Sequence, residues 1–138
     1  MSEKYKSLND QVVNQKKYKD KVTWLVINSS AKGKQGHIKD VKAAKEMYKS
    51  HNMSAHALLL DPDGKVGRKY VAKTTPHMYI IDPKGKLVYQ GAIDSIRSYD
   101  PKDIPKAENY VDRALKEVLA GKRVTKGKTQ AYGCSVKY

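Results

Sequence analysis

The chain has 138 residues and a mass of 15.5 kDa, the size of one ordinary domain. Hydrophobic residues make up 39% of it, and no apolar stretch approaches the roughly 20 residues that cross a bilayer. This composition excludes a membrane span and disorder of the whole chain. Lys and Arg number 28 against 14 Asp and Glu, a net charge of +14 that fits nucleic acid, an anionic membrane or a soluble basic surface.

The first half of the chain predicts a helix, a strand and a second helix. Residues 4–19 form a weakly amphipathic helix with Tyr5, Leu8, Val12 and Gln15 on one face. Residues 22–29, VTWLVINS, are almost all apolar or β-branched, which is typical of a strand buried on both faces near the centre of a sheet. Residues 38–51 read as a helix whose stripe is Ile38, Val41, Ala44, Lys45 and Tyr48.

Two turns of the form DPxG divide the next part of the chain. A strand at 56–60 ends at the turn 61–64, and residues 66–72 form a short helix. A second strand at 78–81 meets the turn 82–85 and continues into 86–92, so these strands form an antiparallel hairpin. The strands at 22–29 and 56–60 are joined through a helix and require a parallel crossover instead.

Residues 106–120 give the clearest helical pattern, and Gly121 caps that helix. From Lys122 onward the sequence is basic and contains glycine, ending in YGCSVKY. We therefore expect a domain at 1–121 and a basic tail at 122–138. The pattern as a whole predicts an α/β sandwich with a mixed sheet.

The chain has one cysteine, Cys134, so it cannot form an internal disulfide, a CxxC redox pair or a zinc cage. Cys134 either has no role in this chain or serves in an intermolecular disulfide or as a redox sensor. The four histidines lack the spacing of metal ligands, and we expect neither a metal nor a cofactor.

The charge pattern disfavours nucleic acid as a partner. Only four of the basic residues are arginine, whose planar fork reads bases and clamps phosphate, and the lysines are spread along the whole chain. The start, MSEKYKSLND, has no signal-peptide core. The cytoplasm is therefore the default location, and the periplasm or secretion would require a leader removed earlier.

Three stretches of the sequence resemble the thioredoxin-like superfamily, and within it the redoxins related to alkyl hydroperoxide reductase and thiol-specific antioxidant proteins. They follow the strand at Val22–Ser30, which belongs to the same resemblance, and are LLLDPDGKVGRKY, KTTPHMYIIDPKGKLVYQGAID and the helix AENYVDRALKEVLAGK. The closing YGCSVKY is similar to the tail of one subgroup, so the resemblance extends from about residue 5 to residue 138. It implies a three-layer α/β/α sandwich with a mixed sheet.

These residues show no counterpart of the N-terminal strand and the redox-cysteine loop with which the family pattern begins. Residues 1–20 look like the remainder of the helix that follows that loop, so the chain is either truncated or a family member without these parts. In the family the missing strand lies between those at 22–29 and 77–82. We expect these two to pair directly, or a second copy or another partner to donate a strand.

The resemblance also implies roles for three residues. Thr75 and Pro76 would form the cis-proline loop that binds substrate beside the redox cysteine, and Cys134 would be a resolving thiol. Complete relatives are expected to catalyse thiol–disulfide exchange or peroxide reduction on a thiol- or disulfide-bearing partner. This chain, without the N-terminal cysteine, is expected to be inactive. The alternative is a non-catalytic interaction module that uses the open sheet or the lysine-rich surface.

Overall fold

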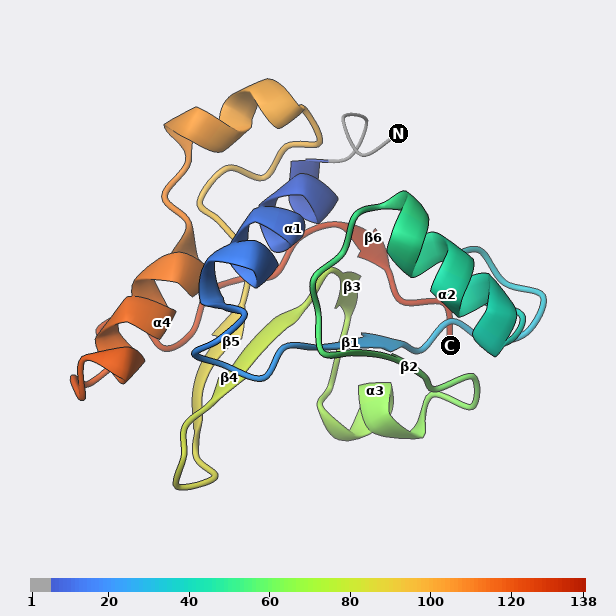
Figure 1. Ribbon diagram of the computed structural model, residues 1–138, viewed down its shortest axis with the longest axis horizontal. Helices are drawn as coiled ribbons and strands as arrows, with labels where there is room; N and C mark the ends of the chain where they lie inside the picture. The colour runs from blue at the N-terminus through green and yellow to red at the C-terminus, as the bar shows by residue number, and fades with distance from the viewer. Residues whose placement is uncertain (1–5) are drawn as a thin grey trace. The chain divides into compact units, whose positions relative to one another are not determined.

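The computed structural model describes residues 6–138 (Figure 1). Over this range the chain is a mixed α/β protein with five helices and three two-stranded sheets. It divides into two compact units. The first unit comprises the chain through Asn14 together with Thr74–Cys134, and the second comprises Gln15–Lys73 and Ser135–Tyr138. No helix within residues 6–138 has the length and apolar content to cross a membrane.

Every helix and strand predicted from the sequence is present, with small differences in bounds. The helices are α1 (Lys6–Tyr18), α2 (Val41–Ser50), α3 (Lys65–Lys69), the 3-10 helix η2 (Pro101–Lys106) and α4 (Tyr110–Leu119). The strands are β1 (Leu25–Asn28), β2 (Ala57–Leu60), β3 (Thr74–Thr75), β4 (Met78–Ile81), β5 (Leu87–Gly91) and β6 (Cys134–Ser135). The sequence did not predict η2, β3 or β6.

The second unit contains the predicted parallel crossover. Strands β1 and β2 run parallel, and α2, which connects them, packs against β2. The carboxylate of Asp40 caps α2 by accepting the N–H of Ala43 at 2.8 Å, which sets the start of the helix later than predicted. In the turn before α3, Asp61 accepts the N–H groups of Val66 and Gly67 at 3.2 and 2.9 Å. Burial acts to raise the pKa of Asp61, and these hydrogen bonds, together with one from the hydroxyl of Ser29 at 2.7 Å, outweigh it and lower the pKa.

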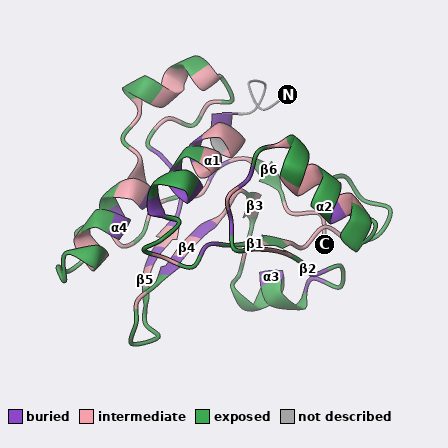
Figure 2. Ribbon diagram, viewed as in Figure 1, coloured by how far each residue is buried: buried purple, intermediate pink, exposed green. Residues whose placement is uncertain are grey.

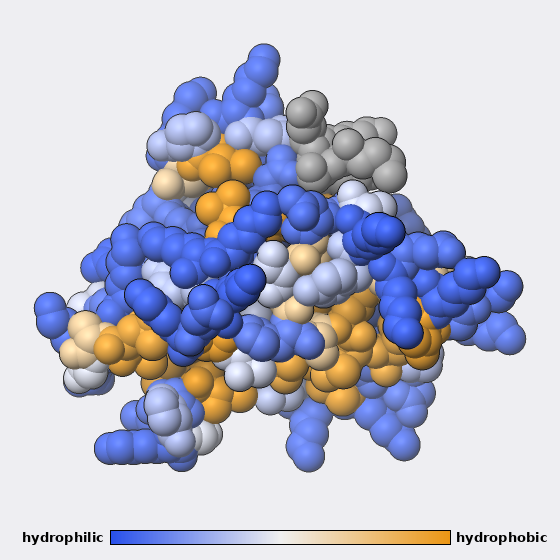
Figure 3. All heavy atoms as spheres, in the orientation of Figure 1, coloured by the Kyte–Doolittle hydropathy of each residue, from blue (hydrophilic) through white to orange (hydrophobic). Residues whose placement is uncertain are grey.

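The prediction that β1 is buried on both faces is wrong. Leu25 and Ile27 are 51% and 41% exposed, and Leu59 on the neighbouring strand is 44% exposed. Helix α2 packs on the other side of this sheet, so one face of the β1–β2 sheet stays open. Figure 3 shows hydrophobic atoms gathered over these two strands.

The strands of residues 6–138 form separate pairs in place of the single mixed sheet expected for a three-layer sandwich. Strand β1 pairs with β2, β4 with β5, and β3 with β6. Direct pairing of 22–29 with 77–82, one of the alternatives expected beside a strand donated by another chain, is not observed. Strands β1 and β4 therefore each pair with a neighbouring strand along one edge only.

The first unit is built on the predicted hairpin. Strands β4 and β5 are antiparallel, and Asp82 in their turn accepts the N–H groups of Lys84 and Lys86, both at 2.9 Å. Helix α4 packs against β4. Buried residues lie along both strands (Figure 2). The apolar core of this unit is Met78, Ile80, Tyr89, Ala92, Ile93, Val111, Ala114, Leu115 and Tyr132.

Helix α1 differs from the predicted amphipathic helix in the kind of residue it buries. Leu8 and Val12 are only half-buried, and Tyr5 lies outside the described residues. The buried positions include Lys6, Asp10, Asn14 and Gln15. Polar partners elsewhere in the fold, rather than apolar contact alone, therefore hold this helix.

Part of the basic tail is packed against the hairpin. Gln90 of β5 donates its N–H to the carbonyl of Gly127 and accepts the N–H of Thr129, both at 3.0 Å. Tyr132, further along the tail, is 7% exposed. The tail through Cys134 is therefore a packed part of the first unit.

Hydrogen bonding along β1 alternates between its two edges. Asp61 donates its N–H to the carbonyl of Asn28 at 2.8 Å, so Asn28 and Val26 turn their backbone groups toward β2. Leu25 and Ile27 turn theirs to the opposite edge, where their N–H groups have no acceptor within residues 6–138.

We expect amide hydrogen exchange to alternate in the same way. The amide of Val26 exchanges slowly because it is bonded to β2, and those of Leu25 and Ile27 exchange at least tenfold faster. Exchange followed by NMR at two protein concentrations measures this contrast. Protection of all three amides at low concentration would contradict an open edge, and protection of Leu25 and Ile27 only at high concentration would indicate strand addition from a second copy.

Candidate functional site

The loop between β3 and β4 carries two of the residues singled out from the sequence. The Thr75–Pro76 peptide bond is cis, as expected. The hydroxyl of Thr74 donates to the carbonyl of Pro76 at 2.8 Å and closes the loop on itself. Thr75 is exposed, and Pro76 is half-buried. The loop therefore presents Thr75 to solvent directly before the hairpin.

The third such residue, Cys134, lies beside this loop. Strand β6, which begins at Cys134, pairs with β3. Gly133 packs so closely on the loop that a Cβ atom placed there would lie 2.2 Å from the carbonyl oxygen of Thr75 and 3.5 Å from the nitrogen of Pro76. The thiol of Cys134 is free and exposed. The structure thus brings Thr75, Pro76 and Cys134 together, although they are almost 60 positions apart in the sequence.

This arrangement offers one exposed thiol next to the Thr75–Pro76 loop, and the chain has no second cysteine. Cys134 can attack a disulfide of another molecule to give a mixed disulfide and release one thiolate. It cannot then form an internal disulfide, because the chain has no other cysteine. Within residues 6–138 no group of three or more His, Cys, Asp or Glu side chains is placed to hold a metal ion.

The histidines have local roles. The ring of His56 accepts the N–H of Trp24 at 3.0 Å. His77 stacks on Tyr79 with 4.7 Å between the ring centroids. His37 and His51 contact the backbone carbonyls of Ser30 and Met47.

A buried polar cluster in the first unit was missed by the sequence reasoning. Lys6 forms an ion pair with Asp94 and donates to the hydroxyl of Tyr132 at 2.8 Å and to the carbonyl of Ile96 at 3.0 Å. Tyr132 donates its hydroxyl hydrogen to Asp94 at 2.6 Å. We call Lys6, Asp10, Asp94 and Tyr132 the buried cluster. Their side chains are closed to solvent, so the buried cluster holds structure and has no access to a substrate.

Asp10 completes the buried cluster with an unusual protonation state. Burial, a hydrogen bond with Asp94 and the negative charge of Asp94 together raise the pKa of Asp10 to about 8, against the opposing charge of Lys6 at 4.0 Å. For Asp94, burial acts to raise the pKa, but hydrogen bonds from Asp10, Lys6 and Tyr132 outweigh it and lower the pKa. At neutral pH the two carboxyl groups therefore share one negative charge.

The fold and this site define a mixed α/β protein with an exposed thiol beside a cis-proline loop. No protein-family model and no curated protein matches the sequence. Two solved structures are similar to it. An uncharacterized conserved protein from Geobacillus kaustophilus matches with a TM-score of 0.82 and 26% identity, over 96% of this chain and 69% of that one. A hypothetical protein from Sinorhizobium meliloti 1021 matches with a TM-score of 0.77 and 21% identity, over 98% of this chain and 73% of that one.

These likenesses establish a fold shared with proteins that are themselves uncharacterized. Each solved chain also contains residues that this chain does not match. The roles of Thr75, Pro76 and Cys134 therefore depend on the resemblance seen in the sequence and on the geometry of the loop.

The close packing of Gly133 on Thr75 gives a testable expectation. Gly133→Ala should lower the free energy of unfolding by about 3 kcal/mol, because the new methyl group meets a backbone oxygen and because Gly133 has a φ of +130°. Gly121→Ala is the matched control, since Gly121 also has positive φ (+71°) but has open space where the Cβ would lie. It should cost only about 1 kcal/mol. Urea unfolding measures both, and equal costs would show that the tail does not pack on the loop.

The raised pKa of Asp10 predicts that stability depends on pH. The folded state keeps a proton that the unfolded state loses above pH about 4, so this group alone lowers stability by up to about 1.4 kcal/mol per pH unit as the pH rises toward 8. Asp10→Asn should therefore stabilise the protein at pH 8 and progressively less toward pH 5. Urea unfolding at pH 5, 6.5 and 8 measures the difference. Asp20→Asn, at an exposed position, is the control, and a gain at Asp10 that did not change with pH would contradict the shift.

Proposed function

We propose that this chain is a thioredoxin-like domain of the redoxin type that contacts a thiol- or disulfide-bearing protein at the Thr75–Pro76 loop. The proposal follows from the resemblance of residues 66–93 and of the closing YGCSVKY to that family. The observation that carries it is the pairing of β3 with β6, which brings Cys134 against this loop.

In this proposal Cys134 forms a disulfide with its partner but does not complete a catalytic cycle. The thiolate of Cys134 attacks one sulfur of the partner's disulfide, the S–S bond breaks, and the other sulfur leaves as a thiolate. Return to the free thiol requires an external thiol, because this chain supplies no second cysteine. The chain by itself is then inactive as an oxidoreductase and acts in single mixed-disulfide events.

The absence of turnover can be tested by insulin reduction. With the chain present and no other thiol added, insulin should precipitate no faster than in the blank without protein, and mass spectrometry should find one mixed disulfide, at Cys134. Cys134→Ser should give the same precipitation rate and no adduct. Faster precipitation that Cys134→Ser abolishes would show a complete cycle and contradict the proposal.

A second experiment distinguishes binding of a partner at the Thr75–Pro76 loop from reaction of Cys134 as a merely exposed thiol. An activated disulfide on an extended peptide and one on free cysteine are each mixed with the chain, and adduct formation at Cys134 is timed. If the Thr75–Pro76 loop binds the peptide backbone, the peptide reacts faster, by about tenfold for about 1.4 kcal/mol of binding. The urea-unfolded chain is the control and should not discriminate. Equal rates with the folded chain would leave Cys134 as an exposed thiol without a binding loop and would contradict the proposal.

A second candidate function is an interaction module without chemistry. It is favoured by the open edge of β1 and by the exposed side chains of Leu25 and Ile27. A strand from a second copy or from another protein would pair with this edge and cover the apolar face. A partner that binds Cys134→Ser as tightly as the unchanged chain would favour this candidate.

A further inference from the structure

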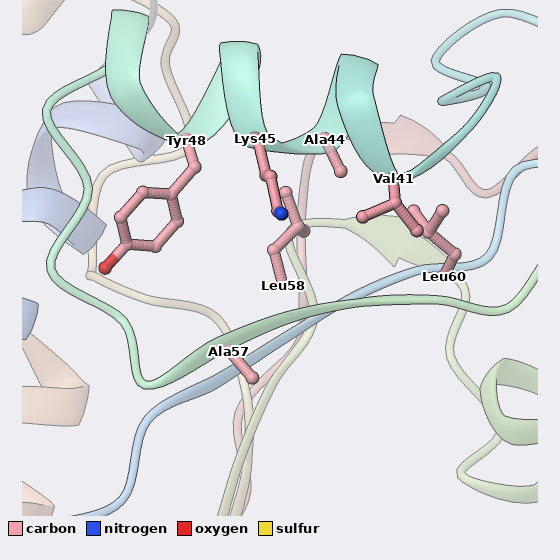
Figure 4. Close-up of a pocket in the computed structure, with 7 residues that line it drawn as sticks. All are labelled: Val41, Ala44, Lys45, Tyr48, Ala57, Leu58 and Leu60. Carbon is pink, nitrogen blue, oxygen red and sulfur yellow. The ribbon is translucent and has the colours of Figure 1, made fainter.

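A pocket lies between α2 and β2 in the second unit (Figure 4). Its volume is about 340 Å³, and pockets that hold small ligands begin at about 300 Å³. It is lined by Val41, Ala44, Lys45 and Tyr48 from the helix and by Ala57, Leu58 and Leu60 from the strand. The space is therefore of the right order for a small organic molecule.

The lining is apolar apart from one charged group. Val41 and Leu60 close one end of the pocket, and the ring of Tyr48 lies at the other (Figure 4). The hydroxyl of Tyr48 donates to the carbonyl of Ala55 at 2.6 Å, so this group is already hydrogen-bonded and its ring forms an apolar wall. None of the lining residues is acidic. Most of a ligand in this pocket must accordingly be apolar.

Lys45 is the charged group of the pocket. Its side chain extends from α2 toward β2 and Leu58 (Figure 4). Within residues 6–138 it has no ion-pair or hydrogen-bond partner. Lys42 and Lys49 are three and four positions away on the same helix, which puts them on the same side of α2. The site thus pairs an apolar pocket with an unneutralised positive charge.

The other charges of the second unit add to the positive potential around the pocket. The second unit contains fifteen Lys and Arg residues and only five Asp and Glu residues, so it carries ten of the fourteen net positive charges of the chain. Such a field raises the local concentration of anions. A ligand with a negative headgroup is therefore favoured over a neutral or cationic one.

We propose that this pocket binds a small anionic amphiphile, a molecule with an apolar body and one carboxylate, such as a medium-chain fatty acid. The apolar body lies between Ala44 and Leu58, and the carboxylate pairs with Lys45. This site is separate from the Thr75–Pro76 loop and does not depend on the function proposed for it.

Decanoate, below the concentration at which it forms micelles, is the probe. Titration followed by methyl NMR should shift the signals of Val41, Ala44, Ala57, Leu58 and Leu60. The dissociation constant should be on the order of 100 μM, as expected for about a dozen non-hydrogen atoms in a partly open pocket. Decanol, which lacks the charge, should bind several-fold more weakly.

Variants of exposed lysines distinguish binding of decanoate in the pocket from its general attraction to a basic surface. Lys45→Met should weaken decanoate binding about three- to tenfold and leave decanol binding unchanged. Lys49→Met removes the same charge from the same helix but does not line the pocket, and Lys45→Arg keeps the charge. Both should bind decanoate within a factor of two of the unchanged chain. Ala57→Met should fill the pocket and abolish binding of both probes, with circular dichroism checking the fold.

Three results would overturn the proposal. Equal weakening by Lys45→Met and Lys49→Met would show non-specific attraction to the basic surface. Shifts confined to Leu25, Ile27 and Leu59 would place the probe on the open sheet face. Binding of an acidic peptide to the lysines of α2 without competition from decanoate would assign them to a macromolecular partner.

Discussion

The buried ion pair between Lys6 and Asp94 is the constraint on which the first unit depends. It joins the start of α1 to the segment after β5, and Tyr132 brings in the tail through hydrogen bonds to both charged groups. Removing one partner of such a pair leaves a buried charge uncompensated and typically costs about 3–5 kcal/mol. Three stretches of chain far apart in sequence are therefore fixed by one connected set of polar contacts.

The same set of contacts positions the candidate site. Tyr132 is two residues before Cys134, so anchoring its ring in the buried cluster fixes where the tail reaches the Thr75–Pro76 loop. Gly133, between them, allows the close approach to Thr75 that a larger residue would prevent. The contacts of Tyr132 and Gly133 therefore order the backbone on the N-terminal side of Cys134 while its thiol stays exposed.

The elements that local sequence patterns encode were predicted from the sequence. The features that depend on contacts between residues far apart in the chain were not. The hairpin at 78–92 and helix α4 were predicted because turn residues and apolar periodicity are local signals. The ion pair joins residues 88 positions apart, and no local pattern marks it. The run at 22–29 is apolar throughout, but such a run does not reveal whether both faces will be covered, and Leu25 and Ile27 are exposed. Strands β3 and β6 are two residues each, too short to give a pattern.

The open face of the β1–β2 sheet also bears on the colloidal behaviour of the protein. An exposed apolar sheet face beside an unpaired strand edge promotes aggregation unless neighbouring charges keep copies apart. Here the open face belongs to the unit that holds most of the net positive charge, so mutual repulsion opposes stacking of copies. Added salt shortens the range of this repulsion to about 10 Å at 0.1 M and leaves the apolar attraction in place. Solubility should therefore fall as ionic strength rises, and storage at low salt suits this chain.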